Sequence, residues 1–184
     1  MLPIQRDLIT IDGIPAHPLL VHAVVVLLPL AALGGLVIAA RASWRRRFGP
    51  AVLALTAVGV AAVPLATRTG NQLKNVLPAN PAIDRHAELG NNLLPFALAY
   101  GVAVLLLVIA GRLADRERGA DTAAGASAGS GDGDGALRVT RTWRRVAIVA
   151  AALVAFTATA ATVQIVRIGH SGSAAVWKGV GGGS

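Results

Sequence analysis

The chain has 184 residues, of which 54% are hydrophobic and 14% are charged, well below the roughly 25% charged residues of an ordinary soluble domain. It carries 17 Lys and Arg against 9 Asp and Glu, a formal net charge of +8, and no Cys. The lack of Cys excludes disulfides, thiolate metal sites and a cysteine nucleophile. The apolar residues fall in four long runs, which excludes a soluble globular domain.

The four apolar runs predict four transmembrane helices, at 19–40, 50–66, 93–110 and 146–166. At 1.5 Å per residue a helix of about 20 residues crosses a hydrocarbon core of about 30 Å, and an open sheet is not stable in lipid. The first run is interpreted as a retained helix rather than a cleaved signal peptide, because it is long and three arginines follow it at 45–47. We therefore expect an all-α membrane protein, a single domain folded as a four-helix bundle.

The connecting segments carry nearly all the charges and predict the topology. Eleven of the 17 basic residues lie between the first two spans or in the connection 111–145. Because basic loops remain in the cytoplasm, this protein is expected in a cytoplasmic (inner) membrane with both termini outside. The excess charge is then a topology signal rather than a nucleic-acid footprint. Three segments would lie outside: 1–18, 67–92 and 167–184. A Gly, Ala, Ser and Asp-rich linker at 119–137 is expected to be flexible.

With this topology all four histidines lie at the outer ends of the helices, at His17, His22, His86 and His170. His22 lies one turn inside the first span, where an unpartnered imidazole is costly, and we interpret it as the most informative residue. His17 and His22 are separated by about 140° on a helix, so they can bind one ion only if His17 lies off the helix. We predict that polar groups of all four helices converge under one outer cap.

Further groups near the histidines are candidate contacts of a bound cofactor. Gly90 lies four residues after His86, on the same face of a short helical lead-in that Asn80 would cap, and leaves room for a flat ring. Three arginines are candidate partners for acidic groups of a ligand, or extend toward lipid headgroups: Arg68, Arg85 and Arg167.

Three sequence motifs resemble a known family. They are His17-Pro18-Leu19-Leu20-Val21-His22, His86-Ala87-Glu88-Leu89-Gly90-Asn91, and Gly169-His170-Ser171-Gly172 with Val176-Trp177. Together they are similar to the bacterial membrane family with domain of unknown function 2231, over about residues 13–181 except the linker. Members often have Pro shortly after the second His, where this chain has Val24 and Val25. Some members are joined to Rieske-type or cytochrome-like domains, so the resemblance implies a redox setting.

Three functions fit these features. The first is an electron-transfer subunit that holds haem b through His22 with His86 or His170, with arginines on the propionates. The second is an outer-face copper or zinc site made of three or four histidines: His17, His22, His86 and His170. The third is a scaffold subunit without a cofactor, whose polar groups bond to loops, quinone or a partner.

Enzymatic activity has little support in the sequence. The predicted spans contain no Asp, Glu or Lys, which argues against a proton relay or an ion-coupled transporter, and no Ser-His-Asp arrangement is recognisable. We expect a binding or electron-transfer subunit in the lipid bilayer, with a respiratory or other redox membrane partner and no nucleic acid.

Overall fold

Four long helices form the molecule in the computed structural model, which describes residues 8–127 and 133–177. They are α1 (Ala16–Ala40), α2 (Ala42–Val76), α4 (Leu93–Ser127) and α5 (Gly133–Trp177), with a short α3 (Pro81–Asn91) before α4. Within the described residues four helical segments are long and apolar enough to cross a membrane. The prediction of an all-α four-helix membrane bundle is confirmed.

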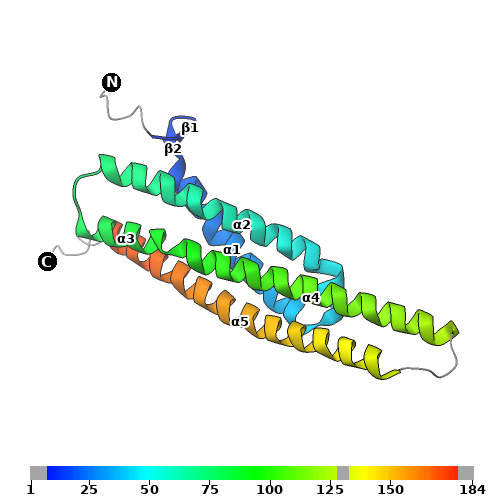
Figure 1. Cartoon of the computed structure of the whole chain (residues 1–184). Helices are drawn as coiled ribbons and strands as arrows, with labels where there is room; N and C mark the ends of the chain where they lie inside the picture. Colours follow the sequence, from blue (N-terminus) through cyan, green and yellow to red (C-terminus); the bar gives the residue numbers. More distant parts are fainter. Residues whose placement is uncertain (1–7, 128–132, 178–184) are drawn as a thin grey trace.

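The helices are arranged as two antiparallel hairpins, α1–α2 and α4–α5 (Figure 1). The hairpins pack so that α2 lies against α4 and α5 lies against α1. The helix α3 packs mainly on α5 and also touches α2. Both ends of the described chain, α3 and the end of α2 therefore gather at one end of the bundle, which we call the α3 end (Figure 1).

The helices are longer than the predicted spans. The second span was expected at 50–66, whereas α2 has 35 residues, because polar helix-forming residues extend it at both ends. The last helix continues to Trp177, into the segment expected as a tail. Helix also covers 119–127 and 133–137, where we expected a flexible linker; the alanines there favour helix. Residues 1–7, 128–132 and 178–184, on which parts of the predicted outer segments and linker fall, lie outside the described residues.

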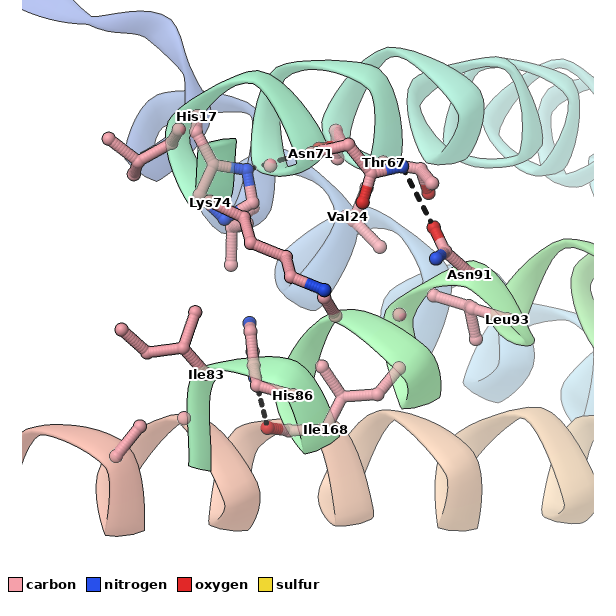
Figure 2. Close-up of a pocket in the computed structure, with 18 of the residues that line it drawn as sticks. His17, Val24, Thr67, Asn71, Lys74, Ile83, His86, Asn91, Leu93 and Ile168 are labelled. Atoms are coloured by element: carbon pink, nitrogen blue, oxygen red, sulfur yellow. Dashed lines mark hydrogen bonds between the residues drawn. The ribbon is translucent and has the colours of Figure 1, made fainter. Parts of the chain in front are cut away.

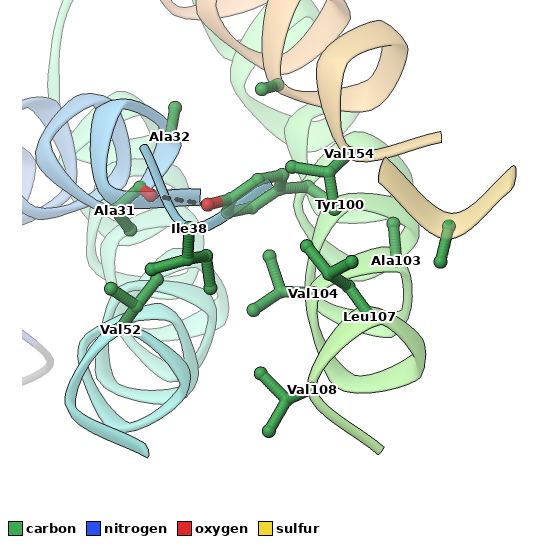
Figure 3. Close-up of a cluster of buried hydrophobic side chains, with 12 residues drawn as sticks. Ala31, Ala32, Ile38, Val52, Tyr100, Ala103, Val104, Leu107, Val108 and Val154 are labelled. Atoms are coloured by element: carbon green, nitrogen blue, oxygen red, sulfur yellow. Dashed lines mark hydrogen bonds between the residues drawn. The ribbon is translucent and has the colours of Figure 1, made fainter. Parts of the chain in front are cut away.

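The core between the hairpins is built from small and branched side chains. Ala31 and Ile38 of α1, Val104 of α4 and Val154 of α5 are fully buried, and they pack around Tyr100 (Figure 3). The Tyr100 hydroxyl donates to the carbonyl oxygen of Ala31 at 2.5 Å. In lipid, helices associate through such close packing and interhelical hydrogen bonds rather than through the hydrophobic effect.

Arg41, Arg46 and Arg118 lie at the end of the bundle opposite α3. Asp115 of α4 accepts from Arg46 of α2 at 3.4 Å and from Arg118 at 3.1 Å, while the Arg41 guanidinium lies over the Trp44 ring at 5.2 Å. The bundle thus has one end rich in Arg and another that carries the histidines.

A small β-hairpin precedes α1 and fixes where that helix begins. The strands Thr10–Ile11 (β1) and Ile14–Pro15 (β2) are joined by Asp12 and Gly13, both with positive φ, the backbone that a two-residue type I′ turn requires. The Ala16 N–H donates to the Ile9 carbonyl at 2.8 Å. His17, the second residue of α1, is therefore held by a folded segment rather than by a loose end.

Candidate functional site

A cavity of about 350 Å³ lies at the α3 end, between α1, α2, α3 and α5. Its walls are mostly aliphatic, with side chains such as Val24, Val63, Leu93, Ile165 and Ile168. The polar side chains that reach it are few: His17, Thr67, Asn71, Lys74, His86 and Asn91 (Figure 2). Such a mainly apolar cavity with a few placed polar groups is typical of a small-molecule site, which measures roughly 300–1,000 Å³.

His17 lines the cavity from α1 and is held against α2. Its Nδ1 lies 3.0 Å from the carbonyl oxygen of Ala66. The same carbonyl accepts a bond from the Thr69 hydroxyl at 3.1 Å. The imidazole lies close against Gly70, where an added Cβ would come within 2.7 Å of the His17 Cε1 atom. A glycine at this position is therefore required for the ring to reach its carbonyl.

His86 lines the opposite wall from α3 and is held against α5. Its Nδ1 lies 3.2 Å from the carbonyl oxygen of Ile168 and 3.2 Å from the Ser171 hydroxyl. That hydroxyl donates to the Ile168 carbonyl at 2.8 Å, and the ring packs on Gly172. The helix that carries His86 is fixed in turn by buried Gln164, whose amide donates to the Leu89 carbonyl at 3.0 Å.

These contacts determine which ring nitrogen remains for a ligand. A main-chain carbonyl only accepts, so Nδ1 of His17 and of His86 carries the proton in the neutral ring and Nε2 keeps a lone pair. A carbonyl bonded to one ring nitrogen is the usual support of a histidine that ligates a metal through the other. Figure 2 shows the second nitrogen of His86 directed away from Ile168, into the space between the two histidines.

The remaining polar groups of the cavity lie on the α2 and α3 side. The Lys74 side chain crosses from α2 toward α3 (Figure 2), and its Nζ lies 2.8 Å from the Asp84 carboxylate. The Asn71 amide donates to Asn91 at 3.1 Å. The cavity therefore has a polar edge on this side that includes the Lys74–Asp84 ion pair, while the α5 side presents Ala175 and Val176.

The structure does not bring the four histidines together. His22 is exposed and outside the cavity, and its Nδ1 donates to the Pro18 carbonyl one turn earlier at 2.6 Å. The rotation of about 140° from His17 places it on the other face of α1, because His17 lies on the helix and not off it. His170 is also exposed and does not line the cavity. Of the four histidines, His17 and His86 therefore line the cavity, whereas His22 and His170 do not.

Of the other residues predicted to contact a cofactor, one lines the cavity and three do not. Gly90 lines the cavity, and a Cβ added there would have no neighbour within 4 Å, so the expected space is present. Arg68 is exposed and lines an adjoining depression that shares Thr67, Asn71 and Asn91 with the cavity. Arg85 pairs with Glu88 at 2.8 Å on the outside of α3, and Arg167 is exposed. None of the three lines the cavity.

Across the residues that the structure describes, no group of three or more His, Cys, Asp or Glu side chains is placed to hold a metal ion. The predicted copper or zinc site of three or four histidines therefore has no counterpart there, because α1 turns His22 away and α5 turns His170 outward. Two histidines on opposite walls of one cavity remain.

Sequence reasoning missed three residues of the site: Lys74, Gly70 and Gly172. Lys74 was counted only as a loop charge, although it follows Gly70 by one helical turn. Gly172 was noted only as part of a motif. The signal that both glycines share is a hydroxyl residue directly before them, Thr69 and Ser171, each of which bonds to the carbonyl that also holds a histidine.

Comparison with known proteins gives one match. A family model described as predicted membrane protein (DUF2231) matches residues 13–131. This range includes His17, His22 and His86 and ends before the motif around His170. No curated protein and no solved structure matches the chain.

Proposed function

Because the chain belongs to the DUF2231 family of predicted membrane proteins, we propose that it is a membrane electron-transfer subunit that binds haem b at the α3 end, with His17 and His86 as the iron ligands. Haem bound between two helices supplies one-electron transfer, with its potential set by the axial ligands and the surroundings. The chain then acts as a binding subunit for a redox partner in the membrane and not as a stand-alone enzyme.

One observation carries this proposal: two imidazoles from different helices face one apolar cavity with both Nδ1 atoms bonded to main-chain carbonyls. Each ring is thereby fixed in orientation and keeps Nε2 free, which is what two axial ligands need. A chance pair of surface histidines would have no reason to share this bonding.

The rest of the lining suits the edges of a haem ring. The aliphatic side chains keep water from the macrocycle, and Gly90 leaves open space in the wall. Lys74 takes the role that we first expected of arginines. Its ammonium lies at the cavity's polar edge, paired with Asp84, and can hold a propionate that shares or replaces this carboxylate. The cavity lining includes Leu77 and Val176, both exposed, so a ligand larger than the enclosed volume extends past them.

The first prediction concerns the absorption spectrum of the detergent-solubilised chain supplied with ferric haem. We expect a Soret band typical of two histidine ligands, lost or shifted in both His17→Ala and His86→Ala. His22→Ala is the matched control, because His22 lies five residues from His17 but outside the cavity; it should keep the spectrum. Thermal unfolding of each variant separates loss of binding from loss of fold.

Three results contradict the haem proposal. One is a colourless protein that carries stoichiometric zinc or copper, which would make the two histidines part of a metal site. Another is a folded protein that binds neither haem nor metal, as the scaffold function requires. A spectrum abolished by His22→Ala and unchanged by His17→Ala would show that the cavity is the wrong site.

We further propose that the Arg-rich end lies in the cytoplasm of a bacterial inner membrane and the α3 end, with the cavity, outside. The arginines around Arg46 and Arg118 support this orientation, since basic segments stay in the cytoplasm. A cofactor in the cavity would then exchange electrons with a partner at the outer surface.

The second prediction tests this orientation with single cysteines, which the chain allows because it has none of its own. Ala79→Cys, in the exposed turn between α2 and α3, should react with a membrane-impermeant maleimide on intact bacterial cells. Ser43→Cys, exposed beside the arginines at the other end, should react only after the cells are permeabilised. The reverse labelling pattern would overturn the orientation.

A further inference from the structure

His17 and His86 are each held by a similar set of groups on a neighbouring helix, which we call the seat of that histidine. In each, a carbonyl on the neighbouring helix accepts from His Nδ1 and from a hydroxyl three residues later, and the imidazole lies close against a glycine one residue further. The first seat consists of Ala66, Thr69 and Gly70 on α2. The second consists of Ile168, Ser171 and Gly172 on α5. The two seats differ in detail, since the Thr69 hydroxyl also donates to the Leu65 carbonyl at 3.0 Å and only Ser171 contacts its histidine directly. The same three groups at the same spacing nevertheless point to repetition of one unit.

The repetition extends along both hairpins. The sequence Ile14-x-x-His17-x-x-Leu20 recurs 69 positions later as Ile83-x-x-His86-x-x-Leu89. With this offset the buried residues of α1 coincide with buried residues of α4: Val24 with Leu93, Leu28 with Ala97, and Ile38 with Leu107. The helices α3 and α4 together therefore correspond to α1.

The second helices of the two hairpins, α2 and α5, correspond as well. Here equivalent positions are 102 residues apart, as Gly70 and Gly172 are. Buried Val52 of α2 coincides with buried Val154 of α5, Thr56 with Ala158, and Val63 with Ile165. The packing agrees, because α2 lies against α4 as α5 lies against α1. Tyr100 corresponds to Ala31, because the two positions are 69 residues apart. Tyr100 donates a hydrogen bond to the Ala31 carbonyl, as expected for corresponding residues that meet on the axis of a two-fold arrangement.

We infer that residues 14–76 form one copy of a hairpin unit, that residues 83–127 with 133–177 form a second copy, and that the histidine cavity lies between the copies as one site with two equivalent halves. The cavity lining agrees, since corresponding residues occur in it together: His17 with His86, Val24 with Leu93, and Gly70 with Gly172. A ligand on this site meets the same nitrogen donor, in the same seat, from both sides.

The halves differ at one edge of the cavity. Lys74 corresponds to Val176, and both line the cavity. An equivalent pair of ligating groups combined with an ammonium at one edge only suits a flat ligand that is ligated from both faces and carries, along one side, acidic groups that share or replace the Asp84 carboxylate on Lys74. This assignment of ligand class rests on the proposed function, whereas the equivalence of the halves rests on the structure alone.

The first arm of the test measures the equivalence without any ligand. In the full-length chain, cysteines are introduced in pairs, spin-labelled, and their separation is measured by pulsed electron paramagnetic resonance. The pair Leu33 and Arg167 corresponds to the pair Val102 and Leu65, and all four residues are exposed. We expect the two pairs to give the same distance within the width of the label distribution. Clearly different distances would overturn the inference.

The second arm uses ferric haem as the probe on the detergent-solubilised chain. His17→Ala and His86→Ala should give the same altered spectrum, and added imidazole should restore the unmodified spectrum in both. A spectrum changed by one substitution and not by the other would overturn the equivalence of the half-sites even though haem binds. If the unmodified chain binds no haem while the label distances agree, the proposed function fails and the two-copy architecture is supported.

Discussion

Replacing Gly70 by alanine is expected to lower the affinity of the cavity for haem by about tenfold or more, a loss of about 1.4 kcal/mol, without removing either histidine. The added Cβ would lie 2.7 Å from the His17 Cε1 atom and 3.1 Å from its Nδ1 atom. No real Cβ approaches a ring that closely, so the imidazole must turn and give up its bond to the Ala66 carbonyl. The ligating nitrogen then loses its fixed direction.

The other glycines at this end provide graded controls. At Gly172 an added Cβ would lie 3.1 Å from the His86 Cε1 atom, so the ring shifts by a few tenths of an ångström and the expected loss of affinity is a few-fold. At Gly169 nothing lies within 4 Å, and affinity should be unchanged. Haem titration followed at the Soret band gives the three affinities. If Gly70→Ala binds haem as tightly as Gly169→Ala, the seat does not control His17.

The number and type of helices could be predicted from the sequence because lipid imposes a simple requirement. Each of the four apolar runs is long enough to span the hydrocarbon core, and only a helix satisfies its backbone groups there. The helix ends could not be predicted in this way. The helical turns that contain Gly70 and Gly172 are polar and lie beyond the apolar runs. We therefore expected these segments to be a loop and a tail, whereas they are helical and form the seats of the histidines.

The pairing of His17 with His86 could not be predicted from local sequence patterns, because it depends on a tertiary contact. His86 reaches the cavity because α3 packs on α5, where Gln164 bonds to the Leu89 carbonyl. His22 attracted attention because it lies deeper in the apolar run, but depth along a helix does not determine the face. The rotation of about 140° between His17 and His22 already showed that they lie on different faces of α1. Which of the two faces the interior depends on the packing of α1 against α2 and α5.

An internal comparison of the sequence would have singled out the two histidines that line the cavity. The recurrence of Ile14, His17 and Leu20 as Ile83, His86 and Leu89, together with Thr69-Gly70 and Ser171-Gly172, marks corresponding positions in two hairpins. Self-similarity is easily missed in membrane helices, because alanine, valine and leucine match one another by chance. The polar residues carry the signal, and here they are the site residues.

The second prediction with a large effect concerns the centre of the bundle, where Gly35→Ala should lower the free energy of unfolding by about 1–3 kcal/mol. The new Cβ would overlap the Tyr100 hydroxyl and lie 3.2 Å from the Val154 Cγ1 atom. Because Tyr100 and Val154 are 1% and 0% exposed, neither has free space into which to move. Gly101→Ala is the matched control, since its nearest neighbour would be Val60 at an ordinary 3.5 Å.

Tyr100→Phe distinguishes this specific clash from a general intolerance of larger side chains. By itself it removes the bond to the Ala31 carbonyl, at a cost of about 1 kcal/mol. In the double variant with Gly35→Ala the overlapping oxygen is absent, so the added cost of the alanine should fall well below its cost in the unmodified chain. Unfolding of the purified protein in detergent, followed by circular dichroism, gives the coupling free energy of the two substitutions. Additive costs would mean that Tyr100 does not occupy the space beside Gly35 and that the hairpins meet differently at the centre of the bundle.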